Sequence, residues 1–161
     1  MRVEKKHPTS LNSHLSILTS KRFSIQNNSH FKMKDNILYT KSMAFAIRCV
    51  NLYKHLTTEK KEFVLSKQLL RSGTSVGANI RESRNAQSPA DFINKLSIAL
   101  KEADETQYWF ELLHHTDFIT EEEFTSINTD VDELISILTS VIKKAKTKLT
   151  MNINQGLGVE K

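Results

Sequence analysis

Two groups of basic side chains are the residues in this 161-residue chain whose type and spacing best suit a chemical role. In the first group, Lys60, Lys67 and Arg71 fall within about 40° of one another on a helical projection, and Arg81 lies nearby. The second group is a run of lysines near the C-terminus, Lys143, Lys144, Lys146 and Lys148. Such clusters bind RNA or DNA by displacing counterions from phosphates. They equally suit a solvated helix face or a last helical turn, so both interpretations stay open.

The net charge of +5 is unevenly divided along the sequence. Residues 1–34 contain seven Lys or Arg and one Glu, whereas residues 35–161 contain sixteen basic and seventeen acidic residues. The first segment therefore carries +6 and the remainder −1. A case for polyanion binding must rest on how charges are distributed over the folded surface, because the total charge is dominated by one terminal segment.

Two glycines, Gly73 and Gly77, lie inside a stretch whose other residues favour a helix, residues 69–82. Each glycine costs about 1 kcal/mol relative to alanine in a helix. A helical projection puts both on the side of the apolar residues Leu69, Leu70, Val76 and Ile80. We therefore predict that two helix backbones approach closely here. A phosphate-binding loop is disfavoured, because the stretch lacks the lysine and the preceding strand of a P-loop.

Polar side chains form two further stripes beside the expected core faces. One has the spacing of a helix face and comprises Gln68, Ser72, Ser75, Asn79 and Glu82. The other lies beside Ile98 and comprises Lys95, Glu102, Glu105 and Trp109. We interpret them as polar and ionic partners at helix contacts, in part between subunits, where such pairs fix register more than they add stability. A catalytic site is the alternative, but the sequence shows no Ser-His-Asp pattern, no Cys-His pair with an orienting residue at suggestive spacing and no glycine-rich phosphate loop.

A carboxylate and a histidine with metal-ligand spacing occur once, as Glu111 and His114. A di-iron site in a four-helix bundle uses two Glu-x-x-His motifs and two further glutamates, and the second motif is absent from this sequence. The one cysteine, Cys49, lies in an apolar run and suits a small buried hydrophobe. We predict no metal, no cofactor and no catalytic residue, and hence a protein that is not an enzyme.

The elements that position these residues are expected to be helices, because the chain has four glycines, two prolines and no regular alternation of β-branched residues. Apolar periodicity and capping residues predict helices over residues 35–56, 58–86, 89–115 and 120–149. Ser88-Pro89 and Thr120-Glu123 mark the starts of the last two. The short connections predict an all-α, up-down-up-down antiparallel four-helix bundle over residues 33–149.

The two ends of the chain lack such periodicity. We expect residues 1–32 to be a disordered or loosely ordered extension, with translation starting at Met33, and residues 150–161 to be a flexible tail. No apolar run reaches the roughly twenty residues that span a membrane. The sequence therefore predicts a soluble, cytoplasmic protein without a membrane partner.

From about Met33 to Leu149 the chain resembles the four-helix-bundle family of 23S rRNA intervening-sequence proteins. The resemblance rests on residues 45–48 (Phe-Ala-Ile-Arg), the run from Phe63 to Ile80 and the segments 91–100 and 102–109. It implies a bacterial, non-enzymatic bundle that forms a cyclic homo-oligomer and associates with RNA. A related branch, the accessory variability determinant of diversity-generating retroelements, looks like a homopentamer that binds nucleic acid and a protein partner. A structural module that binds only another protein is the alternative function.

Overall fold

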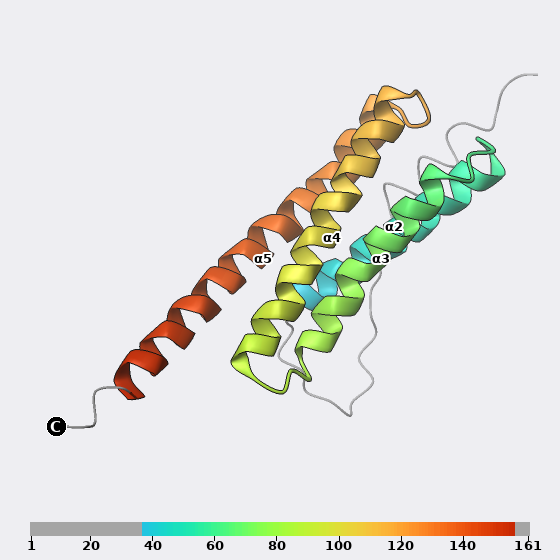
Figure 1. The fold of residues 1–161 in the computed structure, drawn as a ribbon. Helices are drawn as coiled ribbons and strands as arrows, with labels where there is room; N and C mark the ends of the chain where they lie inside the picture. The colour runs from blue at the N-terminus through green and yellow to red at the C-terminus, as the bar shows by residue number, and fades with distance from the viewer. Residues whose placement is uncertain (1–36, 157–161) are drawn as a thin grey trace, which may run out of the picture.

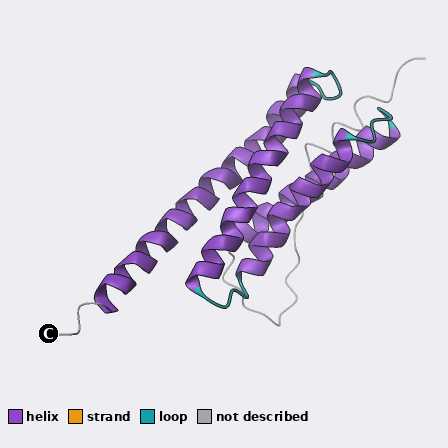
Figure 2. Ribbon diagram, in the orientation of Figure 1, coloured by secondary structure: helices purple, strands orange, loops and turns teal. Residues whose placement is uncertain are grey.

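The computed structural model describes residues 37–156, which form four α-helices without a strand in that range (Figures 1 and 2). The helices are α2 (Ile37–Thr58), α3 (Leu65–Ser83), α4 (Pro89–His115) and α5 (Glu121–Gly156). The chain reverses direction at each connection, so the predicted all-α, antiparallel bundle is confirmed (Figure 1). The predictions for residues 1–32 and for initiation at Met33 lie outside the described residues.

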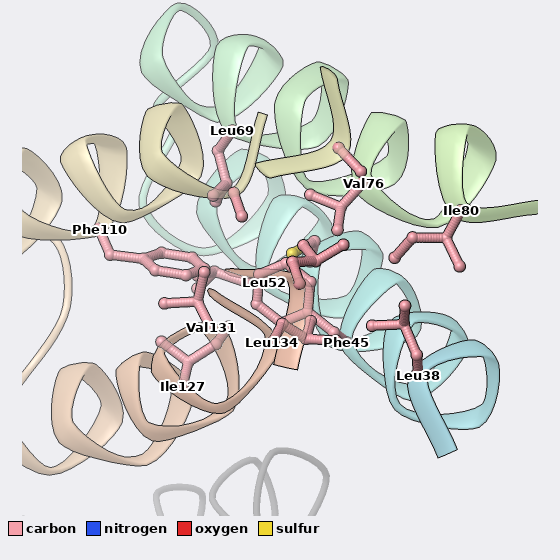
Figure 3. Close-up of a cluster of buried hydrophobic side chains, with 14 of the residues drawn as sticks. Leu38, Phe45, Leu52, Leu69, Val76, Ile80, Phe110, Ile127, Val131 and Leu134 are labelled. Carbon is pink, nitrogen blue, oxygen red and sulfur yellow. The ribbon is translucent and has the colours of Figure 1, made fainter. Parts of the chain in front are cut away.

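Each helix packs against its neighbours in sequence, and α5 closes the bundle through a smaller contact with α2. The predicted apolar stripes all contribute to one core, in which Phe45 of α2 and Phe110 of α4 meet edge to face with ring centroids 6.1 Å apart (Figure 3). The smaller α2–α5 contact is reinforced by Arg48, whose guanidinium donates to the Ser126 carbonyl at 3.0 Å and also pairs with Asp130. The apolar periodicity of the sequence did not predict this interaction of Arg48 with α5.

The start of the second helix differs from the prediction. α2 continues through Thr58, the chain then turns at Lys61 with a φ of 54°, and α3 begins only at Leu65. Glu62 supplies the reason, because its carboxylate accepts hydrogen bonds from the backbone N–H groups of Val64 (2.8 Å), Leu65 (2.8 Å) and Ser66 (2.7 Å). The sequence predicted that Lys60 shares a helix face with Lys67 and Arg71. This prediction is wrong, because Lys60 lies in the connection between α2 and α3.

The predicted starts of α4 and α5 are confirmed, whereas the predicted start of the first helix at residue 35 lies outside the described residues. Ser88 Oγ accepts from the Asp91 N–H at 3.1 Å, and Thr120 with Glu123 forms a reciprocal capping box. α5 continues to Gly156, so the predicted end near Leu149 was too early, and residues 150–156 of the predicted tail are helical. α3 ends at Ser83 and not near Ala86.

At Gly73, α3 packs closely against both α2 and α4. A Cβ at this position would lie 2.5 Å from Cys49 Sγ and 2.9 Å from Cys49 Cβ on α2, and 3.5 Å from Thr106 Cγ2 on α4. At Gly77 the nearest atom to such a Cβ is the Ser42 carbonyl oxygen at 3.5 Å, an ordinary van der Waals distance. The predicted close approach is therefore confirmed, and Gly73 is the glycine that it requires.

We expect opposite effects from alanine at the two glycines. Gly73→Ala should lower the free energy of unfolding by about 1–3 kcal/mol, because its methyl group must displace Cys49. Gly77→Ala should raise it by up to about 1 kcal/mol, because the site has room and alanine favours the helix. Urea unfolding followed by circular dichroism measures both, and equal effects at the two sites would contradict this account of the packing.

A second prediction concerns Glu62. Burial alone would raise the pKa of its carboxyl group, but the hydrogen bonds from Leu65, Ser66 and Val64 outweigh burial and lower the pKa below the usual value for glutamate. The carboxylate therefore stabilises the fold above its unfolded-state pKa of about 4.3, and this contribution is lost as the pH falls through the lower folded-state pKa.

Glu62→Gln should accordingly lower the free energy of unfolding by about 0.5–2 kcal/mol at neutral pH. It should also flatten the dependence of that free energy on pH between about 5 and about 3. Glu111→Gln is the matched control, since Glu111 is exposed on α4. An unchanged pH profile in Glu62→Gln would show that this carboxylate does not hold the start of α3.

Candidate functional site

Charge is separated along the length of α5. Its first half carries only acidic charges, Glu121, Glu122, Glu123, Asp130, Asp132 and Glu133. Its second half carries only basic ones, the four exposed lysines Lys143, Lys144, Lys146 and Lys148. The basic half runs past the connection between α3 and α4, at the lower end of the bundle in Figure 1. The sequence predicted only that these lysines lie near the end of the last helix. The structure shows that they lie at one end of the bundle.

The end of α3 adds two arginines to this region. Arg81 donates from Nη1 to the hydroxyl group of Tyr39 at 3.1 Å, and the guanidinium carbon of Arg84 lies 5.6 Å from the centroid of the Tyr39 ring. Arg84 also lines a shallow groove whose opposite wall contains Lys148 and Asn152 of α5. We call the six cations of this region the basic end, namely Arg81, Arg84, Lys143, Lys144, Lys146 and Lys148.

A second shallow hollow runs along α5 itself and is lined by Lys143, Lys144 and Lys148. Lys148 and Asn152 line both hollows, so the two adjoin each other on α5. Sequence reasoning did not include Arg84, which lies just past the end of α3. The sequence could have pointed to Arg84, because it lies three residues after Arg81 and residues so spaced share a helix face.

The other predicted basic residues lie elsewhere. Lys60 is in the α2–α3 connection, and Lys67 and Arg71 are in the first half of α3, toward the opposite end of the bundle from the lysines of α5 (Figure 1). Arg71 is also paired, because its Nη2 lies 3.0 Å from Glu105 Oε1. The structure therefore places the end of α3, which carries Arg81, at the same end of the bundle as the four lysines, and both lie away from Lys60, Lys67 and Arg71.

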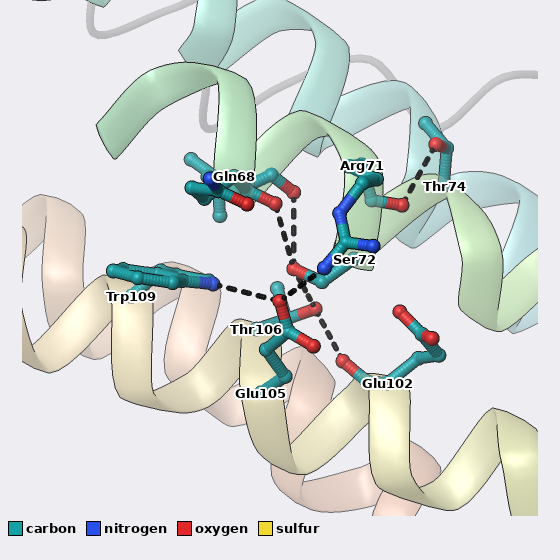
Figure 4. A network of polar contacts seen from close by, with 9 residues as sticks. Gln68, Arg71, Ser72, Thr74, Glu102, Glu105, Thr106 and Trp109 are labelled. Atoms are coloured by element: carbon teal, nitrogen blue, oxygen red, sulfur yellow. Dashed lines mark hydrogen bonds and ion pairs between the residues drawn. The ribbon is translucent and has the colours of Figure 1, made fainter. Parts of the chain in front are cut away.

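The two predicted polar stripes meet along the contact between α3 and α4 (Figure 4). The buried Thr106 hydroxyl donates to Ser72 Oγ at 2.9 Å, and the Ser72 hydroxyl donates to the Gln68 carbonyl oxygen at 3.1 Å. We call this contact the seam, and its polar residues are Gln68, Arg71, Ser72, Ser75, Asn79, Glu82, Lys95, Glu102, Glu105, Thr106 and Trp109.

Two ion pairs cross the seam. Glu105 Oε1 accepts from Arg71 and also from the Trp109 indole N–H at 3.2 Å. Lys95 Nζ lies 2.6 Å from Glu82 Oε2, and the hydrogen bond and charge of Glu82 raise the pKa of Lys95 above its usual value. The predicted ionic partners thus include pairs within one chain. Ser75 and Asn79 are half-buried, and the Asn79 amide donates within α3 to the Ser75 carbonyl oxygen at 2.9 Å.

The residues with potential reactivity are held in ordinary structural roles. Burial raises the pKa of the Cys49 thiol far above its usual value, so the thiol is a poor nucleophile. His114 Nε2 lies 2.9 Å from Glu121 Oε2, and its ring stacks on Phe124. Over residues 37–156, no three His, Cys, Asp or Glu side chains are grouped to hold a metal ion. None of the helices described is long and apolar enough to cross a membrane.

The fold and these surfaces define an all-α four-helix bundle whose notable chemistry is charge on its surface. Residues 34–140 match the family model of the 23S rRNA-intervening sequence protein, and the chain belongs to this family. It is 63% identical to a protein with unknown function from the S23 ribosomal protein family of Bacteroides thetaiotaomicron VPI-5482, whose crystal structure was solved at 1.70 Å. The match covers 66% of this chain and 98% of that one, with a TM-score of 0.66. No functionally curated protein matches the chain.

Proposed function

We propose that this protein is a non-catalytic, self-associating bundle of the cytoplasm that binds RNA through its basic end. The observation that carries the proposal is the gathering of six cations, none of which forms an ion pair with a carboxylate among residues 37–156. Unpaired cations are free to replace the counterions of a phosphate backbone. Cations that already face a carboxylate, such as Arg71, gain less from a phosphate.

The likeness of this chain to its family supports RNA as the polyanion. The family description, 23S rRNA-intervening sequence protein, names an RNA. Self-association would repeat the basic end in each copy, so that modest patches act together on one extended ligand. A cyclic oligomer, such as a homopentamer, would place the basic ends of all copies on one side of a ring.

A protein partner is the second candidate, and one observation favours it. Met43 and Ile47 lie one turn apart on the outer side of α2 and are 41% and 43% exposed. Neighbouring exposed apolar side chains are characteristic of surfaces that bind other proteins. This candidate predicts a partner captured from the source cell and no salt-dependent binding of RNA.

Replacement of the four lysines of the basic end by glutamine tests the first proposal. Binding of a fluorescently labelled RNA hairpin should weaken by more than about tenfold at moderate salt. The slope of log affinity against log salt should become shallower by about 3, because about four phosphate contacts are lost. Fluorescence anisotropy across a salt series measures both quantities.

The matched control replaces four exposed lysines outside the basic end, Lys54, Lys60, Lys61 and Lys67, by glutamine. This variant has the same net charge as the first one, so a specific role for the basic end predicts near wild-type binding. Equal weakening in both variants would show that only total charge matters. Absence of binding by the wild-type protein at low salt would overturn the RNA proposal and leave the protein-partner candidate.

A further inference from the structure

The groove at the basic end combines apolar and cationic side chains in one hollow. It is formed by the connection between α3 and α4, the first turn of α4 and the second half of α5. Its lining includes Arg84 and Lys148 together with the apolar residues Pro89, Phe92 and Leu149. The volume of about 590 Å³ lies within the range of about 300–1,000 Å³ that is usual for sites of small ligands.

Phe92 provides an aromatic surface in this groove. It lies in the first turn of α4, is half-buried and packs against the hydrophobic core, while it also lines the groove. The core therefore holds the ring in place, and the rest of the side chain is open to a ligand. A fixed aromatic ring is a surface on which planar groups such as nucleobases stack.

The charge around the groove favours an anion. Neither Arg84 nor Lys148 pairs with a carboxylate among residues 37–156, and the Arg84 guanidinium is held beside the Tyr39 ring. None of the described residues that line the groove is acidic. Asp91, in the first turn of α4, is outside the lining, and its carboxylate accepts from the Gln87 N–H at 3.1 Å.

Two side-chain amides complete the lining, Gln87 in the connection and Asn152 on α5. Both residues are exposed, and neither amide group hydrogen-bonds to another residue that the structure describes. Such amides offer donors and an acceptor to the edge of a base. The groove thus presents a ring for the face of a base, amides for its edge and cations for its phosphate.

We infer that the groove binds one unpaired nucleotide of an RNA strand, with the base stacked on Phe92 and the phosphate between Arg84 and Lys148. A base within a duplex is covered on both faces by its neighbours and must leave the stack before it can enter such a site. The inference rests on the RNA binding proposed above and deepens it. The lysines attract any phosphate backbone, and the groove selects unpaired nucleotides.

Phe92→Leu tests the stacking, because leucine keeps an apolar side chain against the core and removes the aromatic face. We expect the affinity of the full chain for a single-stranded RNA to fall by about tenfold. The affinity for an RNA duplex with the same number of phosphates should not change. The slope of log affinity against log salt should also stay the same, because no phosphate contact is lost. Fluorescence anisotropy with both RNAs measures these quantities.

Phe118→Leu is the matched control, since Phe118 is also half-buried against the core but lies in the connection between α4 and α5, at the other end of the bundle. We expect it to bind both RNAs like the wild type. Circular dichroism shows whether each variant is folded. Should Phe92→Leu unfold, Asn152→Ala at the exposed end of α5 takes its place, with a loss of about fivefold for the single strand alone.

The outcomes separate this inference from the proposed function. Wild-type binding of the strand by Phe92→Leu, or an equal loss for strand and duplex, would overturn the nucleotide site and leave RNA binding in place. A wild-type protein that binds neither RNA at low salt would overturn both. Polyglutamate that displaces the strand as well as an unlabelled strand of equal charge does would overturn the nucleotide in favour of an acidic peptide.

Discussion

The close approach of α3 to both of its neighbours at Gly73 is the constraint on which the rest of the structure depends. At this residue the sulfur and Cβ of Cys49 on α2 occupy the space that a Cβ would need, and the methyl group of Thr106 on α4 lies at van der Waals distance on the other side. Three helices therefore meet at one level of the bundle. Gly73 loses about 1 kcal/mol of helix propensity, and the gain is tight packing around the buried Phe45 and Phe110.

This approach also explains why the seam between α3 and α4 is polar. Ser72 precedes Gly73 on α3, Thr106 faces Gly73 from α4, and both are fully buried. Because their hydroxyl groups are small and hydrogen-bond to each other, the two backbones can lie close together without an unsatisfied polar group. The longer side chains are displaced to the edge, where Arg71 pairs with Glu105 and Lys95 with Glu82. Such pairs fix the register of the two helices more than they stabilise them.

The antiparallel topology then decides where charge collects. Because α5 runs down the length of the bundle, its acidic first half and basic second half lie at opposite ends. The end of α3 arrives beside the basic half, and Tyr39 holds Arg81 and Arg84 there. Among the described residues, the molecule thus separates its charges along its length, and Arg84 and Lys148 line one groove at the basic end.

The sequence by itself determined the helix class, two of the helix starts and most of the core, because apolar periodicity and capping are local properties of the chain. It missed the start of α3, since Glu62 caps that helix through three N–H groups from outside the usual capping position. Tertiary structure alone decided that Gly73 requires glycine while Gly77 has room, and that Arg84 joins the lysines while Lys60 does not. These outcomes depend on distances between helices that are remote in sequence, and spacing along one helix carries no information about them.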